Sequence, residues 1–254
     1  MNIVCIGAGR LAHHLMPELQ YAGHVITQVY NRTPWPAVLL SQKLHHADHI
    51  TKLDDLNTEA DFYFLTVADD AISEVATEIA RLDDLKGIVV HCSGVSGLDL
   101  IPSSQRGIFY PLQTFSEHHE VEWAQTPIII TSDKEDISQK LHKLARTISS
   151  VVYTMDEDKK SIVHLAAVFA NNFTNHLMTL AEDICKKHDV PFEILKPLIY
   201  STFQKAIQNG PSESQTGPAI RGDEKTIQKH LALLEDQPEV KRIYKMITES
   251  IVSR

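Results

Sequence analysis

Three small residues near the start of the chain have the spacing of a phosphate-binding turn. Gly7, Gly9 and Ala12 form the pattern G-x-G-x-x-A between a short apolar run and a helical pattern. The first glycine of such a turn permits the tight bend, the second lets the backbone approach a pyrophosphate, and the third small residue lets the helix pack closely. The helix start at Arg10 and Leu11 then presents free N–H groups to the phosphates. We predict a dinucleotide site here, the alternative being a Rossmann-like sheet that has lost its cofactor.

The residues after the second predicted strand indicate which dinucleotide the turn would hold. An NAD enzyme usually places an acidic residue about 20 positions after the glycines, where it binds the ribose 2′-hydroxyl. This chain has Asn31, Arg32 and Thr33 in that region instead. The guanidinium of Arg32 suits a 2′-phosphate, with Asn31 and Thr33 as additional donors. We therefore favour NADP(H) over NAD(H), the alternative for Arg32 being a solvated surface side chain.

Residues that follow two later predicted strands are expected to line the nicotinamide side of the same site. Ligands of open α/β sheets bind at the carboxyl ends of the strands. Val67 and Ala68 follow one of these strands, and His91 and Ser93 stand at the end of the next. We assign Val67, Ala68 and Ser93 to cofactor binding and His91 to catalysis as a candidate proton donor. The alternative for His91 is a strand-end histidine bonded to the backbone.

The elements that must position these residues alternate between strand and helix in the first part of the chain. Near-continuous apolar strands separated by amphipathic stretches predict an α/β fold with a doubly wound, mostly parallel Rossmann sheet. After about residue 154 the strand signals stop and apolar residues follow helical spacing, so we predict two domains. Residues 1–154 form the NADP-binding domain, and residues 155–254 form an all-helical domain for substrate binding and dimerisation. The predicted strands are 2–6, 24–30, 61–67, 87–92, 107–110, 127–131 and 151–154, and the predicted helices are 10–22, 34–46, 69–82, 133–149, 156–188, 192–208, 223–235 and 238–252.

Longer segments resemble a known group of proteins. The glycine turn, the N-R-T after the second strand and the helical second half together resemble the superfamily that includes pyrroline-5-carboxylate reductase and 6-phosphogluconate dehydrogenase. Within it, segments 109–115, 164–172 and 216–223 are similar to a bacterial subgroup of Rossmann-type NADP oxidoreductases, the last segment carrying the signature T-G-P-x-x-R-G-D. The resemblance implies an NADP-binding Rossmann domain, a C-terminal domain like that of 6-phosphogluconate dehydrogenase, and a homodimer. It implies no particular substrate.

Two departures from these relatives bear on the chemistry. The histidine that the subgroup usually carries in the first of the three segments is Tyr110 here, which weakens the case for proton transfer at that position. In β-hydroxyacid dehydrogenases of the superfamily a catalytic lysine precedes an asparagine by four residues on the first long helix. Neither Asn171 nor Asn172 has a lysine four positions before it. Lysine-assisted oxidation of a hydroxy acid is therefore disfavoured, and reduction of an imine or carbonyl remains.

Four residues of the helical half are candidates for contacting a substrate. Asn171 and Asn172 interrupt an apolar helix face, where a buried amide needs a partner. We assign Asn171 to catalysis and Asn172 to substrate binding, the alternative being a polar helix–helix contact. Arg221 suits a substrate carboxylate or phosphate and is assigned to catalysis and substrate binding. Its alternative is a salt bridge with an acid of the long predicted helix, and Thr216 is a further substrate-binding candidate.

Composition argues against several other function classes. The chain of 254 residues has a formal net charge of −9, so a nucleic-acid backbone is a poor partner. No apolar run approaches the roughly 20 residues that span a bilayer, so we expect no membrane segment. Cys5, Cys92 and Cys185 are isolated from one another, which fits a reducing cytoplasm.

The 14 histidines raise the question of a metal site. His45 and His49 stand four apart, as the ligands of metal-binding helices do, but no acid or cysteine cluster accompanies them. The neighbouring histidines at 13–14 and 118–119 are isolated pairs. We therefore expect no metal.

Together these features predict a cytoplasmic NADP(H)-dependent oxidoreductase. Hydride would pass between the nicotinamide and a small polar substrate, an imine or carbonyl, held in a cleft between the two domains. The long apolar helix predicts a homodimer formed through the helical domains. The rival hypothesis is a non-catalytic NADP(H)-sensing or scaffold protein, because the fold alone does not separate the two. A reductase that uses a deazaflavin coenzyme is a third alternative, which no particular residue favours.

Overall fold

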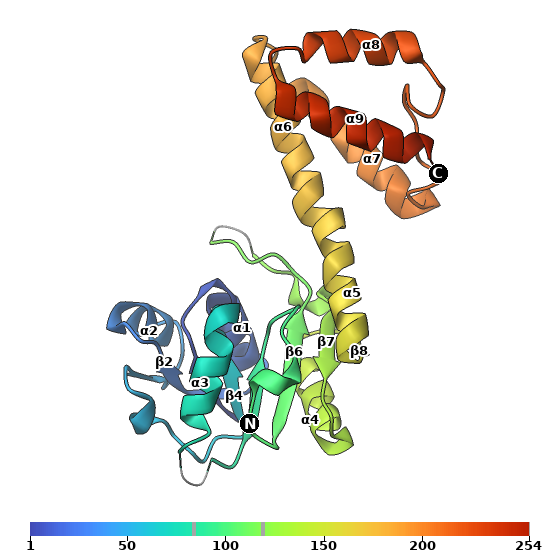
Figure 1. Ribbon diagram of the computed structural model, residues 1–254. Helices are drawn as coiled ribbons and strands as arrows, with labels where there is room; N and C mark the ends of the chain where they lie inside the picture. The colour runs from blue at the N-terminus through green and yellow to red at the C-terminus, as the bar shows by residue number, and fades with distance from the viewer. Residues whose placement is uncertain (83–84, 118–119, 254) are drawn as a thin grey trace. The chain divides into compact units, whose positions relative to one another are not determined.

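The computed structural model describes residues 1–82, 85–117 and 120–253, and an eight-stranded sheet dominates its first part (Figure 1). The strand order is β3-β2-β1-β4-β5-β6-β7-β8, and every neighbouring pair is parallel except β6 with β7. The order reverses between β1 and β4, where open sheets of this kind form a ligand-binding crevice. The predicted doubly wound, mostly parallel sheet is therefore confirmed. The strands are β1 (Asn2–Ile6), β2 (Val25–Tyr30), β3 (Asp48–Ile50), β4 (Phe62–Leu65), β5 (Ile88–His91), β6 (Arg106–Pro111), β7 (Ile128–Thr131) and β8 (Val152–Thr154).

Both faces of the central strands are buried, because successive side chains of a strand point to opposite sides of the sheet. On one face Ile3 and Phe64 belong to a core that also takes residues of α1, α2 and α4. On the other face Val4 and Leu65 pack in a second core with residues of α3. Strands buried on both sides explain the near-continuous apolar runs of the sequence. The helices are α1 (Arg10–Tyr21), α2 (Pro34–Ser41), α3 (Ile72–Ile79) and α4 (Glu135–Ala145).

The second half of the chain is helical. The sequence predicts one helix over 156–188, and the structure has α5 (Glu157–Ala167), a π-helical segment η5 (Val168–Phe173) and α6 (Thr174–Lys187) in succession. The carboxylate of Asp156 caps α5 by accepting a hydrogen bond from the Lys159 N–H at 2.8 Å. The remaining helices are η6 (Phe192–Leu195), α7 (Lys196–Asn209), α8 (Glu224–Leu233) and α9 (Pro238–Val252).

The chain divides into two compact units, Met1–Val168 and Phe169–Arg254. Helix α5 thus belongs to the first unit, whereas the sequence pattern changes near residue 154. One reason is Lys160 of α5, which is fully buried. Its ammonium donates to the carbonyl oxygens of Ser93 at 3.2 Å and Ser96 at 2.6 Å, in the loop after β5.

The second unit buries few side chains. Among its described residues only Ala219, Leu231 and Leu234 are buried, and α6, α7 and α9 contain no buried residue. Across the described part of the chain, no helix combines the length and apolar character needed to cross a membrane.

Candidate functional site

A pocket of about 670 Å³ lies at the carboxyl ends of β1, β2 and β4. It brings together residues from three separate stretches of sequence. The predicted cofactor residues that line it are Gly7, Gly9, Asn31, Arg32, Thr33, Val67 and Ala68. Arg10, Leu11 and Ser93 were predicted with them but are not part of its wall.

The backbone conformation and the packing of the protein require a glycine at position 7. Its φ is +103°, and a Cβ atom there would lie 2.8 Å from Val67 Cγ1 and 2.9 Å from the carbonyl carbon of Thr66. Its N–H donates to the carbonyl of Tyr30 at 2.8 Å, which ties the turn to the end of β2. Its own carbonyl accepts hydrogen bonds from the Thr66 hydroxyl at 2.6 Å and from the Cys5 thiol at 3.3 Å. The turn is thus fixed to β1, to β2 and to the end of β4 at once.

Gly9 differs, because the packing of the protein does not require a glycine there. Its φ of −84° and ψ of −174° suit any residue. A Cβ atom would come no closer than 3.6 Å to the nearest heavy atom, the carbonyl oxygen of Thr66. Gly9 is also the N-cap of α1, where no side chain caps the helix and no acidic residue stands in the first turn. A bare backbone at the positive end of a helix, on the wall of a pocket, suits the close approach of a phosphate.

The three residues after β2 have different tasks. The side-chain oxygen of Asn31 accepts the Ala8 N–H at 3.2 Å, and its amide donates to the carbonyl and hydroxyl of Thr33, both at 3.0 Å. Asn31 therefore braces the glycine turn, a task that the sequence did not reveal. Arg32 is exposed on the pocket wall, and no other described residue forms a hydrogen bond or salt bridge with its guanidinium. Arg32 is therefore the group of the three that is best placed to bind an anion.

Acidic side chains, which the sequence did not identify, form another part of the pocket wall. Asp70, Glu74 and Glu78 line it from the segment around α3. Burial raises the pKa of Tyr30, and Glu78 adds to the effect, whereas Arg32 opposes it. Among the described lining residues Arg32 is the single lysine or arginine. An anionic ligand is therefore favoured near Arg32 and the start of α1 and disfavoured near α3.

His91 is bonded to the backbone through both ring nitrogens. Its Nε2 lies 3.1 Å from the carbonyl of Gly97, to which it must donate, and its Nδ1 accepts the Ser93 N–H at 3.2 Å. The residue is fully buried, and burial lowers its pKa to about 4. This is the backbone-bonded alternative of the sequence analysis, and it argues against His91 as a proton donor because neither nitrogen is open to a ligand.

Ser93 holds the turn after β5. Its hydroxyl donates to Asp69 Oδ2 at 2.8 Å and accepts the N–H groups of Val95 at 3.3 Å and Ser96 at 3.0 Å. Its carbonyl is one of the two acceptors of the buried Lys160 ammonium. These contacts give Ser93 a positioning role at the sheet edge, where the sequence suggested contact with the cofactor.

A tyrosine and a histidine meet at the carboxyl end of β6. Tyr110 Oη and His164 Nδ1 of α5 are 3.0 Å apart, and both residues are partly exposed. A Cβ atom on Gly94 would collide with His164 Nδ1 and lie 2.8 Å from Tyr110 Cζ, so the backbone after β5 packs directly against the pair. Burial raises the pKa of Tyr110, and the Asp69 carboxylate raises it further, so the hydroxyl is protonated at neutral pH. Sequence reasoning missed this pair because its members are 54 positions apart.

The residues predicted in the helical half all lie in the second unit and are exposed. Asn171 and Asn172 belong to the π-helical segment η5, a type of irregularity frequent at functional sites. Thr216 and Arg221 lie in the segment between α7 and α8. The residues that line the nucleotide-type pocket belong to the first unit instead. The roles of these four residues therefore stay predictions.

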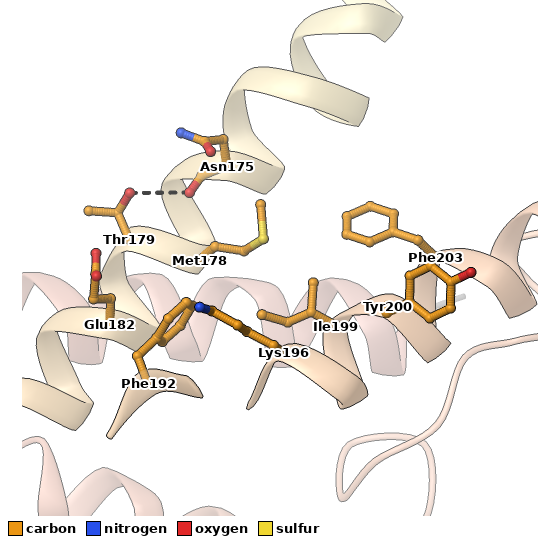
Figure 2. A pocket seen from close by; sticks show the side chains of 9 residues that line it. All are labelled: Asn175, Met178, Thr179, Glu182, Phe192, Lys196, Ile199, Tyr200 and Phe203. Carbon is orange, nitrogen blue, oxygen red and sulfur yellow. Dashed lines mark hydrogen bonds between the residues drawn. The ribbon is translucent and has the colours of Figure 1, made fainter. Parts of the chain in front are cut away.

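The second unit has a pocket of its own, of about 460 Å³ (Figure 2). Side chains of α6, η6 and α7 form its wall, and the apolar Met178, Phe192, Ile199 and Phe203 are prominent among them. The dashed line in Figure 2 is a hydrogen bond within α6, from the Thr179 hydroxyl to a backbone carbonyl. This wall favours apolar contact over the binding of phosphate.

No group of three or more histidine, cysteine, aspartate or glutamate side chains in the described residues is arranged to hold a metal ion. His49 lies in β3, so it does not share a helix with His45. The pair at 118–119 lies outside the described residues.

Two family models match most of the chain between them. A Rossmann-like domain matches residues 1–114, and DUF2520, a domain of unknown function, matches residues 126–251. No curated protein matches the chain. Among solved structures, the chain is 37% identical to a candidate NADP oxidoreductase from Bacteroides fragilis, with a TM-score of 0.90 over 100% of this chain and 98% of that one.

Two reductase structures share the fold at low identity. An imine reductase from Myxococcus stipitatus in complex with NADP+ is 16% identical, with a TM-score of 0.67 over 100% of this chain and 92% of that chain. A reductive aminase from Aspergillus terreus in complex with NADPH and ethyl levulinate is 14% identical, with a TM-score of 0.73 over 99% and 93%.

The contrast between the two glycines predicts opposite effects of the same substitution. Gly7→Ala should lower the free energy of unfolding by about 1–3 kcal/mol, because alanine would be strained at this φ and would collide with Val67 and Thr66. Gly9→Ala is the matched control, expected to leave this free energy unchanged or to raise it by up to about 1 kcal/mol. Denaturant unfolding followed by circular dichroism measures both values. Equal destabilisation by the two variants would contradict this account of the turn.

The burial of His91 predicts sensitivity to acid. Its pKa is about 4 in the folded chain against an ordinary value of 6.5, so the unfolded chain binds the proton more tightly. The associated stability is complete above pH 6.5 and is lost as the pH falls toward 4, by on the order of 3 kcal/mol. His91→Gln retains an amide donor and acceptor but does not titrate, so its stability should fall less between pH 7 and pH 4. Parallel stability curves for the two proteins would show that His91 is not responsible.

Proposed function

The chain belongs to the same family as the Bacteroides fragilis protein, and it combines a Rossmann-like domain with a DUF2520 domain. From this premise we propose that the protein is an NADP(H)-dependent oxidoreductase. One observation carries the proposal: Gly9, a glycine that packing does not require, stands at an uncapped helix start on the wall of a 670 Å³ pocket. The names of the relatives support the cofactor. One is a candidate NADP oxidoreductase, and two reductases of the same fold were solved with NADP+ or NADPH.

Each part of the cofactor has a suitable partner in the pocket. The N–H groups at the start of α1 would hold the pyrophosphate, and Arg32 with the Thr33 hydroxyl would hold the 2′-phosphate. Because the strand order reverses between β1 and β4, the adenosine half would lie toward β2 and the nicotinamide half toward β4, β5 and β6. When bound, the reduced nicotinamide supplies a hydride to the substrate.

The hydride acceptor that we propose is the C=N or C=O group of a small polar molecule. The shared fold with an imine reductase and a reductive aminase supports this class. Thr216 and Arg221, in the loop with the T-G-P-x-x-R-G-D signature, and Asn171 and Asn172 are the proposed substrate contacts. A guanidinium is suited to a carboxylate or phosphate on such a substrate.

We also propose that two copies associate through the second unit. Tyr200, Phe203 and Ile207 of α7 are three or four positions apart and so share one face, with exposed fractions of 66%, 40% and 84%. On η5, which precedes α6, Phe169 and Phe173 stack edge to face at 4.9 Å and are at least half exposed. Helices with so little buried apolar area are not stable without a partner surface. A second copy presents the same apolar faces, as a two-fold dimer requires, and would fill the apolar pocket of Figure 2.

The cysteines support a reducing compartment, and we propose the cytoplasm. Cys5, Cys92 and Cys185 are all free thiols. Burial raises the pKa of Cys5 to about 12 and also raises that of Cys92, so neither is a reactive thiolate.

Arg32→Ala tests the cofactor assignment. Charge-assisted hydrogen bonds contribute about 1.5–3 kcal/mol, so the Kd for NADPH should rise about 10- to 100-fold while the Kd for NADH stays within about twofold. Gly9→Ala should weaken both nucleotides, because its methyl group occupies the approach to the pyrophosphate. Arg81→Ala removes an exposed arginine that lies outside the pocket wall and serves as the control. Nicotinamide fluorescence measures each Kd, and equal affinity of the unmodified protein for NADPH and NADH would overturn the 2′-phosphate assignment.

Ile207→Glu tests the dimer. Ile207 is 84% exposed in the single chain, so the charge should not disturb the fold but should separate two copies that meet there. Light scattering should give the mass of two chains for the unmodified protein and of one chain for the variant. Tyr21→Glu places the same charge on a 90% exposed residue of α1 and should leave the dimer intact. A monomeric unmodified protein at micromolar concentration would refute the proposal.

A further inference from the structure

We propose that Tyr110 is the acid that protonates the substrate during reduction and that His164 returns a proton to it. This assignment rests on the proposed reductase function, and it goes against the expectation from the sequence, which disfavoured proton transfer at position 110. It replaces His91, whose two nitrogens are both bonded to the backbone.

The position of the pair at the sheet edge supports the assignment. Strands β1, β4, β5 and β6 are parallel, so their carboxyl ends share one edge of the sheet. The glycine turn follows β1, Gly94 lies in the turn after β5, and Tyr110 is the second-last residue of β6. A dinucleotide that crosses the reversal of strand order places its nicotinamide half over the ends of the strands beyond β4. The Tyr110 hydroxyl therefore stands at the end of the site where the reaction would occur.

The state of the two side chains also suits proton donation. The Tyr110 hydroxyl is protonated at neutral pH and partly exposed, so a substrate can reach it. His164 Nδ1 is 3.0 Å away, and no other described residue forms a hydrogen bond with the Nε2 atom of this partly exposed ring, which can exchange protons with water. The close packing of Gly94 against both rings restricts the movement of the two side chains.

Two other ionisable groups near the pair, Lys160 and Asp69, are engaged in holding the turn after β5. Lys160 is fully buried and donates to two carbonyl oxygens, so it cannot reach a substrate. The carboxylate of Asp69 accepts the Ser93 hydroxyl, so it is engaged in holding the turn after β5. Lys160 acts as a positioning residue, because it fixes the loop that contains Gly94.

The proton transfer balances as follows for an imine. The hydride adds to the carbon of the C=N bond, and the electron pair of the π bond moves to nitrogen. That nitrogen takes the proton of Tyr110 Oη. The imidazole of His164 takes a proton from water at Nε2, which releases hydroxide, and gives its Nδ1 proton to the tyrosinate. Loss of the Nε2 proton and gain of one at Nδ1, both by exchange with water, restore the starting tautomer. The sum is one hydride and one solvent proton added across the double bond.

An assay with two different hydride acceptors distinguishes proton donation from every other role of Tyr110. A neutral cyclic imine, assayed above its own pKa, needs a hydride and a proton, whereas the matching N-methyl iminium ion needs the hydride alone. Tyr110→Phe should reduce kcat for the neutral imine by about 100-fold or more, the usual contribution of a positioned general acid. For the iminium ion kcat should stay within about threefold, and the Kd for NADPH should stay within about twofold. Tyr21→Phe, the same change at a 90% exposed tyrosine, should alter none of these values.

A histidine variant tests the second half of the assignment. His164→Asn should slow reduction of the neutral imine less than Tyr110→Phe does, and should leave kcat for the iminium ion within about threefold of its value in the unmodified protein. Thermal unfolding of both variants tests whether the fold is intact. If His164→Asn does not fold, His164→Gln provides the second test of the pair.

The possible results distinguish this assignment from the function on which it rests. Equal losses with both acceptors, or full activity of Tyr110→Phe with the neutral imine, would overturn the role of Tyr110 and leave the reductase proposal intact. Failure of the unmodified protein to bind NADPH would overturn the cofactor assignment. Binding of NADPH without reduction of either acceptor would overturn the reductase proposal, and this assignment with it, in favour of a nucleotide sensor.

Discussion

The geometry of the candidate site depends on the closure of the backbone at Gly7. The residue combines a left-handed φ with contacts so close that no Cβ atom fits, and its two polar backbone groups bind β2 and the end of β4. The turn therefore cannot shift relative to the sheet without breaking several contacts at once. The start of α1, two residues later, inherits this fixed position, and the exposed N–H groups of the helix are oriented before any ligand arrives.

The parallel strands fix the positions of other residues along the same edge of the sheet. Each strand delivers the residues that follow it to the same edge of the sheet, so residues that follow five different strands become spatial neighbours. Several of these residues stabilise the turns themselves. Asn31 braces the glycine turn, Ser93 and His91 bind the turn after β5, and Lys160 supports it from α5. The residues free to meet a ligand, such as Arg32 and Tyr110, are therefore held on a rigid base.

Features encoded by neighbouring residues could be predicted from the sequence. The glycine turn and the alternation of strands and helices have local signals, and α9 lies at the predicted residues 238–252. Tasks that depend on tertiary contacts could not be predicted. Asn31 was expected to face a phosphate, but its amide is engaged with Thr33, and the meeting of Tyr110 with His164 depends on the path of a helix that follows the sheet. The π-helical turn at η5 also has no signal in the apolar periodicity, which runs through it.

The antiparallel pairing of β7 with β6 determines the direction in which α5 runs. Because β7 is antiparallel to β6 and β8 follows β7, the chain leaves β8 heading away from the edge where the nucleotide-type pocket opens. Helix α5 then turns back toward that edge, where Lys160 meets the loop after β5 and, one helical turn later, His164 meets Tyr110. Had β7 joined parallel to its neighbours, a helix following β8 would start at the pocket edge and carry its side chains away from it. The reversed direction of β7 and β8 thus brings His164, a helix residue far from the glycine turn in sequence, to the edge of the sheet where the pocket opens.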